Sequence, residues 1–160
     1  MEFDLRPIGV IKTSFESAAA TPIQSSKSEA NGEAIVDQEF EEGLISLDLF
    51  SHVILLYWFH RAISPRLKVV PYLGQSERGL FSTRAPSRPN PVGISVVELL
   101  RVEGNRLFFK GADMLDGTPL IDIKPFILEF DCRPTANSGW LREFLENESQ
   151  SFLGDLRFQG

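Results

Sequence analysis

The pattern of apolar and polar residues along the chain is mainly that of β-strands. Phe3 to Phe15 carries alternating and β-branched apolar residues around Pro7, and His52 to Phe59 (HVILLYWF) is a continuous apolar run. Because neither segment keeps a helical spacing over a useful length, both predict strands. The continuous run predicts a strand that is buried on both faces.

Three further segments extend this β pattern. Val92 to Val102 and Leu107 to Gly111 are separated by the short sequence EGN, a glycine-containing connection that is typical of a β-hairpin. Leu120 to Phe130 follows the turn signal DGTP and predicts another strand. Several short strands with turns between them favour a mainly β fold, a small closed or partly open barrel, over alternating strands and helices.

Only two stretches predict helices. Glu42 to Phe50 is long enough for one or two turns, and Ser138 to Phe152 has Asn137 and Ser138 as candidate N-caps. The second stretch places apolar residues on one side, namely Trp140, Leu141, Phe144 and Leu145. We expect this helix to cover a barrel end or a subunit partner. Thr21 to Gly32 is polar and turn-prone, and predicts a mobile loop.

Length and composition indicate one cytoplasmic globular domain that spans residues 1–160. The chain has 160 residues, of which 42% are hydrophobic, and this suffices to bury a core without a metal or disulfide. No apolar run approaches the roughly 20 residues that cross a bilayer. The amino terminus, MEFDLRPIGV, lacks the features of a signal peptide. The single cysteine, Cys132, allows no internal disulfide and is interpreted as a structural thiol.

Charge is distributed unevenly along the chain. The net charge is −6, which argues against nonspecific binding of polyanions by the molecule as a whole. Arg61 to Arg88 nevertheless contains six basic residues and one acid, while Ser28 to Asp48 contains seven acids and no lysine or arginine. The basic segment predicts a face that attracts an anion, and the acidic one is interpreted as solvated surface.

The familiar catalytic signatures are absent from the sequence. It contains no G-x-G-x-x-G after a strand, no P-loop and no G-x-S-x-G elbow. His52 and His60 are eight residues apart on one apolar run, which separates them by roughly 26 Å in a strand. They cannot share a metal ion, and we expect no metal site.

Polar residues at the ends of apolar strands are the first candidates for a site. His60 and Arg61 follow the most hydrophobic run in the chain, where a strand brings side chains to a rim. Asp113 and Asp116 lie in GADMLDG after another apolar strand. A partly exposed histidine or a turn-holding aspartate would explain these residues without a function, and for Asp116 before a glycine we favour the turn.

The segment GLFSTRAPSRPNPVGIS is harder to explain by structure alone. Its three prolines restrict the backbone, so the loop loses little entropy when a ligand binds. Arg84 and Arg88 supply donor forks suited to carboxylate or phosphate, and the side chain of Asn90 both donates and accepts. We interpret the segment as a rigid binding loop.

This segment, together with PIGVIKTSF, LFSHVILLYWFH and GADMLDGTPLIDIKP, resembles the TrmO, or TsaA-like, family of S-adenosylmethionine-dependent tRNA methyltransferases in its short form. The resemblance runs from about Pro7 to Pro125. It implies a β-barrel that forms a homodimer and binds S-adenosyl-L-methionine in a cleft near the subunit interface. The implied activity is methylation of N6 of threonylcarbamoyladenosine, next to the tRNA anticodon, so tRNA is the implied partner.

Carried over residue by residue, the resemblance implies a cofactor cleft formed by Gln24, His60, Arg61, Arg84, Ile94, Asp113, Met114, Leu115 and Asp116. Arg84 is the candidate for the cofactor's carboxylate, either aspartate for its ribose or amino group, and Ile94 and Leu115 for its adenine. The candidates for accepting a hydrogen bond or proton from the N–H of the acceptor amine are His60, Asn90 and Asp113.

Two other functions remain open at this point. Longer bacterial members of the family continue into a second domain that is not expected here, so contacts with RNA would have to come from the basic segment and the dimer. One alternative keeps the cofactor but methylates another nucleoside or a small molecule. The other is a non-catalytic module that holds an anion or a peptide in the stiff loop.

Overall fold

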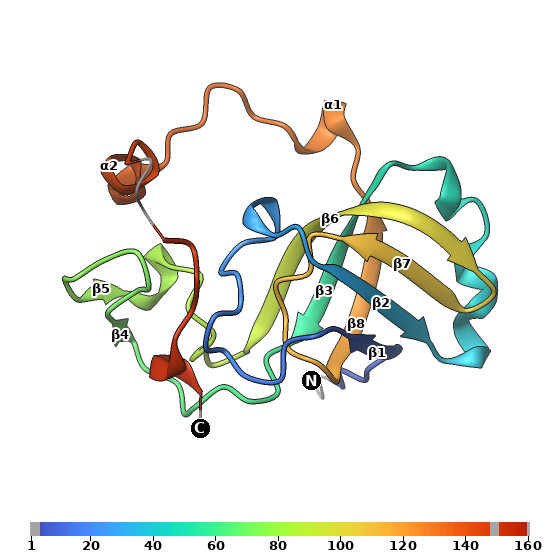
Figure 1. The fold of residues 1–160 in the computed structure, drawn as a ribbon, viewed down its shortest axis with the longest axis horizontal. Coiled ribbons are helices and arrows are strands. Elements are labelled where there is room, and N and C mark those ends of the chain that lie inside the picture. Colours follow the sequence, from blue (N-terminus) through green and yellow to red (C-terminus); the bar gives the residue numbers. More distant parts are fainter. Residues whose placement is uncertain (1–3, 148–150, 160) are drawn as a thin grey trace.

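The fold is given by a computed structural model that describes residues 4–147 and 151–159. Six antiparallel strands close into a barrel in the order β1-β2-β7-β6-β3-β8, which confirms the predicted barrel (Figure 1). The strands of the barrel are β1 (Gly9–Lys12), β2 (Asn31–Val36), β3 (His52–Trp58), β6 (Val92–Glu103), β7 (Arg106–Lys110) and β8 (Thr118–Pro125). A small second sheet of β4 (Lys68–Val69) and β5 (Arg78–Gly79) stands beside it.

The interior of the barrel is filled by the inward-facing residues of each strand. In β3 the buried residues are Val53, Leu55 and Tyr57, while Ile54 and Leu56 between them are half-buried. The prediction that this strand is buried on both faces is therefore wrong, because a closed barrel has only one interior. The hairpin predicted around EGN is confirmed as β6 and β7.

The helices are short, and most are 3-10 turns. The helix predicted over Glu42 to Phe50 is replaced by two 3-10 helices, η2 (Gln38–Leu44) and η3 (Leu47–Leu49), because Ser46 between them has a φ of 68°. The other 3-10 helices are η1 (Ser25–Lys27), η4 (Leu80–Ser82), η5 (Gly139–Leu141) and η6 (Leu156–Phe158).

Two predicted elements end earlier than expected. The strand predicted over Leu120 to Phe130 ends at Pro125, after which the α1 helix (Leu128–Asp131) begins. The carboxylate of Asp131 accepts a hydrogen bond from the Ile127 amide at 2.8 Å and holds this turn. The helix predicted over Ser138 to Phe152 is reduced to η5 and α2 (Arg142–Leu145), and part of the predicted range lies outside the described residues.

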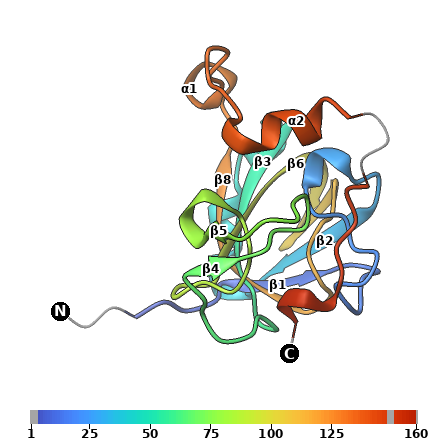
Figure 2. The same cartoon turned by 90° about the vertical axis from the view of Figure 1, so that its left-hand side faces the viewer.

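A second small core joins the β4–β5 sheet to the carboxyl-terminal segment. Val69, Leu80 and Ala85 pack with Phe158 from η6, and the Tyr72 ring meets the Phe158 ring edge to face with 5.2 Å between centroids. We call this part, residues 61–91 with 151–159, the lobe. The carboxyl-terminal segment runs alongside the barrel to reach it (Figures 1 and 2).

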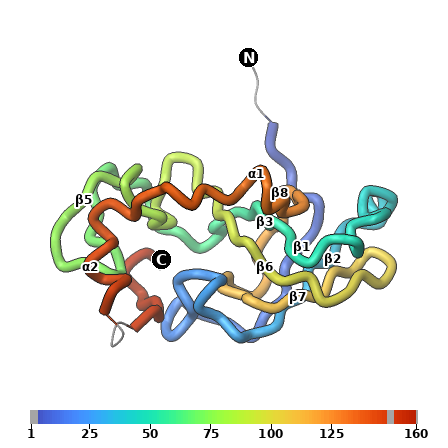
Figure 3. The backbone as a smooth tube through the Cα atoms, turned by 90° about the horizontal axis from the view of Figure 1, so that it is seen from above, coloured from blue at the N-terminus to red at the C-terminus, as the bar shows by residue number. Residues whose placement is uncertain are grey.

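Residues 126–138 form an arch that leaves the barrel after β8 and returns to the lobe at α2 (Figures 1 and 3). The indole Nε1 of Trp140 donates to the Ser82 carbonyl at 2.8 Å, which attaches the far end of the arch to η4. Leu128 and Phe130 on the arch are 64% and 67% exposed. In the described ranges no helix has the length and apolar character of a membrane span.

Candidate functional site

A cavity of about 850 Å³ lies where the barrel meets the lobe. Its walls come from seven segments of the sequence. They are residues 18–27, the end of β3 and the residues after it, Pro71 to Leu73, the stretch from Phe81 to Arg88, the start of β6, the β7–β8 connection, and carboxyl-terminal residues from Asn137 on. The barrel therefore supplies one side of the cavity, and the lobe supplies the other.

Eight of the predicted cofactor residues line this cavity, namely Gln24, His60, Arg61, Arg84, Ile94, Asp113, Met114 and Leu115. Two predicted residues do not. Asn90 is exposed on the proline-rich loop, where its carbonyl accepts from the Val92 amide. Asp116 points to the end of β1, where its carboxylate accepts from Lys12 at 2.8 Å and from the Thr13 amide at 3.1 Å.

The role of Asp116 follows from these contacts. The hydrogen bond from Lys12 is the main cause that lowers the pKa of Asp116, so its carboxylate is ionised at neutral pH. It holds the turn before β8 against β1, as its position before a glycine suggested.

Asp113 is the one acidic residue among the described residues that line the cavity. The Ser95 hydroxyl donates to its Oδ1 at 2.6 Å, and the Ser95 oxygen lies 3.0 Å from the Tyr57 hydroxyl. Since the single proton of Ser95 is used on Asp113, Tyr57 is the donor to Ser95. A chain of hydrogen bonds thus runs from the barrel interior to a carboxylate at the cavity wall.

Burial raises the pKa of Asp113 to about 6, and the hydrogen bond from Ser95 partly opposes this effect. The pKa of Tyr57 is raised mainly by burial and then by the charge of Asp113, so the phenol stays protonated. Asp113 therefore changes its charge close to neutral pH, while Tyr57 remains a donor.

The pairing of β3 with β6 positions this chain of hydrogen bonds. Tyr57 on β3 is paired with Gly93 on β6, and a Cβ at Gly93 would lie 2.3 Å from the Tyr57 ring. The ring occupies the space that any side chain at position 93 would fill. This contact explains why position 93 in NPVG has to be glycine in this fold.

The proline-rich loop forms the lobe side of the cavity. Arg84 is exposed, and its guanidinium donates to the Gln24 side-chain oxygen across the cavity at 3.0 Å. Arg88 donates to the carbonyls of Thr83 and Ala85 at 3.0 and 3.3 Å. Arg88 thus braces its own loop, whereas the Arg84 fork has only a neutral hydrogen-bond partner within the described part of the chain and can receive an anion.

His60 and Arg61 lie at the rim, as the end of the apolar run predicted. Partial burial, and then the charge of Arg61, lowers the pKa of His60. The imidazole is therefore neutral at pH 7 and able to accept a proton. Arg61 donates to the Glu16 carbonyl at 2.6 Å, which fixes it to the 13–18 segment.

The cavity is cationic although the protein is acidic. Lys27, Arg61, Arg84 and Arg88 line it against Asp113 alone, and none of the four forms an ion pair with a carboxylate in the described part of the chain. The acidic segment around η2 and η3 lies at the opposite end of the molecule (Figures 1 and 3). The charge asymmetry of the sequence is therefore a separation in space.

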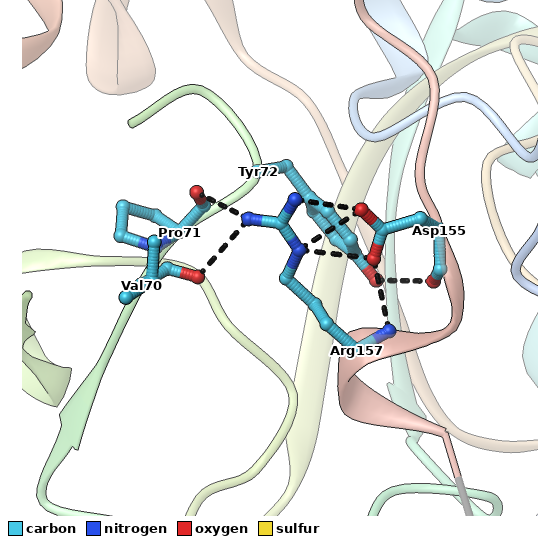
Figure 4. Close-up of polar contacts among 5 residues, drawn as sticks. All are labelled: Val70, Pro71, Tyr72, Asp155 and Arg157. Carbon is cyan, nitrogen blue, oxygen red and sulfur yellow. Dashed lines mark hydrogen bonds and ion pairs between the residues drawn. The ribbon is translucent and has the colours of Figure 1, made fainter. Parts of the chain in front are cut away.

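The carboxyl-terminal segment closes one side of the cavity. Phe152, Gly154, Phe158 and Gln159 line it. Arg157 holds the segment to the rest of the lobe, because its guanidinium donates to the Pro71 carbonyl at 2.9 Å. The Asp155 carboxylate, two residues away in the same segment, binds the guanidinium at 2.7 Å and keeps it in place (Figure 4). The Tyr72 hydroxyl donates to the Asp155 carbonyl at 3.2 Å.

Thr21 to Gly32, predicted as a mobile loop, is tied into the same wall. The Thr21 hydroxyl donates to the Ser17 carbonyl at 2.6 Å, and the Ser28 hydroxyl donates to the Ala112 carbonyl at 2.5 Å. Both side chains are buried. Side-chain hydrogen bonds of this kind take the place of the apolar anchors that the segment lacks.

Several residues at the cavity were not predicted. Tyr57 was hidden within an apolar run, and Lys27 belongs to a polar, turn-prone segment. Trp140 and Phe152 belong to the stretch that predicted a helix, which was expected to cover a barrel end or a subunit partner and not to line a site. Ser95 carried a usable signal, since a serine at an inward position of an alternating strand needs a partner in the interior.

The tRNA-methyltransferase O N-terminal domain matches residues 10–132 of the chain. The chain belongs to this family. The resemblance found in the sequence is therefore confirmed, and the residues after 132 that complete the cavity lie outside the matched domain.

Relatives of the chain carry related names. A probable S-adenosyl-L-methionine-binding protein of Pyrococcus abyssi is 49% identical over 139 residues, which are 86% of this chain and 76% of that protein. The tRNA (adenine(37)-N6)-methyltransferase of Mus musculus is 37% identical over 133 residues, which are 78% of this chain and 31% of that protein. The crystal structure of TrmO from Pseudomonas aeruginosa superimposes with a TM-score of 0.74 at 38% identity, over 87% of this chain and 62% of that one. The chain thus spans less than two thirds of the solved TrmO chain.

Proposed function

We propose that this protein binds S-adenosyl-L-methionine in the cavity between barrel and lobe and methylates N6 of threonylcarbamoyladenosine next to the anticodon of tRNA. The observation that carries the proposal is that Arg84, His60 and Asp113, from three separate segments, line one cationic cavity. Membership of the tRNA-methyltransferase O family supports the choice of reaction.

The side chains present fit the chemistry of this cofactor. Arg84, which has no carboxylate partner among the described residues, suits the cofactor's own carboxylate. Asp113 suits a hydroxyl or amino donor. Ile94, Met114 and Leu115 offer an apolar surface for adenine. When bound, S-adenosyl-L-methionine supplies an activated methyl group.

The chain itself has to orient the acceptor amine and take up its proton. Alignment of the reacting groups supplies much of the acceleration in such a displacement. Asp113 is our choice for the proton acceptor, because it lies in the cavity wall and Tyr57 and Ser95 hold it in place. His60 is the second choice, and Asn90 is disfavoured because it is exposed and does not line the cavity.

We also propose that the active form is a homodimer. Ile94, Val96 and Leu100 lie in a row on the outer face of β6, which Glu98 interrupts, and are 50%, 37% and 46% exposed. Ile94 also lines the cavity, so a partner on this row would reach the cavity rim. A Val96→Glu variant should sediment as a monomer where the wild type sediments as a dimer.

The proposed reaction is tested with purified protein, S-adenosyl-L-methionine and tRNA that carries unmethylated threonylcarbamoyladenosine. Mass spectrometry of the digested nucleosides should show a gain of one methyl group on that nucleoside. Transfer to free nucleosides but not to tRNA would replace the acceptor in our proposal. Cofactor binding without any transfer would indicate a binding module.

A further inference from the structure

Phe81 is an aromatic side chain displayed at the mouth of the cavity. It is 76% exposed although it lines the cavity. Its two neighbours explain this position: Leu80 is only 1% exposed in the lobe core, and the Ser82 carbonyl and hydroxyl are bonded to Trp140 and to the Gly79 carbonyl. The η4 turn therefore cannot rotate Phe81 inward without removing Leu80 from the core.

The Phe81 ring has a cation on one side. The Arg88 guanidinium lies 5.7 Å from the ring centroid, and its bonds to the Thr83 and Ala85 carbonyls hold it there. Because the ring is still mostly exposed, the rest of its surface is open. An arginine over an aromatic ring at this distance stabilises the ring's orientation.

The same arrangement recurs around the mouth of the cavity. Lys27 lies 4.8 Å from the Phe152 ring centroid, and both residues line the cavity. Arg78 lies 4.9 Å from the Trp140 ring centroid, next to η4. Alternating cations and aromatic rings are the arrangement by which proteins bind single-stranded nucleic acid, since rings stack on bases and cations meet phosphates.

We propose that Phe81 is a stacking platform for an unpaired nucleotide of the RNA substrate, beside the nucleotide that enters the cavity. The inference rests on the proposed function, because it takes RNA as the acceptor. It gives Phe81 a positioning role in substrate binding and none in cofactor binding. Four cations line the cavity without an ion-pair partner among the described residues, and they support a polyanionic partner over an apolar protein surface.

The test measures the affinity of a fluorescein-labelled anticodon stem-loop RNA that carries threonylcarbamoyladenosine, by fluorescence anisotropy. Phe81→Ala should weaken RNA binding about tenfold or more, within the range known for loss of one stacked base. Phe81→Tyr should keep the affinity within about twofold, because it retains the ring. Ile45→Ala is the matched control, since Ile45 is equally exposed at 77% and does not line the cavity.

Calorimetry with S-adenosyl-L-methionine separates the inference from the proposed function. We expect Phe81→Ala to bind the cofactor as the wild type does. Wild-type protein that binds no RNA would refute the proposed acceptor together with this inference. Three results for Phe81→Ala would overturn the inference alone. The first is RNA affinity equal to that of the wild type. The second is a loss of cofactor affinity equal to the loss of RNA affinity, which would make Phe81 a cofactor contact, and the third is a changed sedimentation coefficient, which would make it a subunit contact.

Discussion

The Ser95 hydroxyl donates a hydrogen bond of 2.6 Å to Asp113, from inside the barrel to the wall of the cavity. This contact joins the interior of the barrel to the cavity in which we propose that the ligand binds. It also makes the charge of Asp113 measurable in two independent ways, through stability and through activity.

The first prediction concerns stability and pH. Burial raises the pKa of Asp113 from 3.8 to about 6 in the folded state. The folded protein therefore binds more protons than the unfolded chain between these values, and its stability falls as pH rises through this window. The loss attributable to Asp113 is about 3 kcal/mol at most, from about two pKa units.

Urea unfolding of the wild type and of Asp113→Asn between pH 4 and pH 7 measures this effect. The amide side chain stays neutral and keeps an oxygen for Ser95 to bind. The wild type should lose stability relative to the variant as pH increases. A difference that does not change with pH would show that Asp113 titrates at its ordinary pKa.

The second prediction concerns the proton acceptor. If Asp113 accepts the proton, methyl transfer should decline as pH falls below about 6, the pKa of this carboxyl. The decline should persist in His60→Gln and disappear in Asp113→Asn, whose residual rate should not depend on pH in this range. The opposite result, with the decline lost only in His60→Gln, would assign proton uptake to the histidine.

The third prediction removes the link between the two residues. Ser95→Ala takes away a hydrogen bond that lowers the pKa of Asp113, so the acid limb of the activity profile should move to higher pH. The variant also leaves the Tyr57 hydroxyl buried without its partner, at a cost of about 1–3 kcal/mol. Adding Tyr57→Phe should recover part of this stability, and an unchanged acid limb would contradict the assignment.

The fourth prediction concerns the carboxyl-terminal wall. Arg157→Lys keeps the charge but loses the fork that binds Asp155 and the Pro71 carbonyl. Local opening of residues 151–159 should become easier by about 1 kcal/mol, so their amide hydrogens should exchange about fivefold faster, and cofactor binding should weaken.

Arg101→Lys is the matched control for this change. Arg101 also binds a carboxylate two residues away, on Glu103, and lies over an aromatic ring, that of Phe108. It is on the barrel and does not line the cavity. Equal effects of the two variants on cofactor binding would show that the wall does not depend on Arg157.

The barrel could be predicted from the sequence because its strands carry simple local signals. The hairpin around EGN and the run HVILLYWF each specify a strand without reference to the rest of the chain. The run alone does not show which of its residues face the interior. Closure of the sheet into a barrel decides this, because it places Tyr57 inward and leaves Leu56 half-buried.

The site could be predicted only in part. Motif residues such as Arg84 and Asp113 lie at the ends of strands or in loops, where a polar residue next to an apolar run can be recognised in the sequence. The opposite wall could not be predicted. Phe152 and Gln159 are held at the cavity by backbone bridges and by the Arg157 contacts, and such contacts produce no periodic pattern of residues in the sequence. Asp116 and Asn90 share motifs with cavity residues but do not line the cavity, and the motifs themselves give no sign of this difference.

The most direct test of our account is calorimetric titration of S-adenosyl-L-methionine into the wild type, Arg84→Ala and Arg66→Ala. Arg84 is exposed, so its loss should leave the fold intact while removing the proposed carboxylate partner, whereas the exposed Arg66 lies outside the cavity lining. We predict saturable binding to the wild type, unchanged in Arg66→Ala and at least about tenfold weaker in Arg84→Ala, the loss of roughly one charged hydrogen-bonded contact. Wild-type affinity in Arg84→Ala, or no binding to the wild-type protein, would contradict the account.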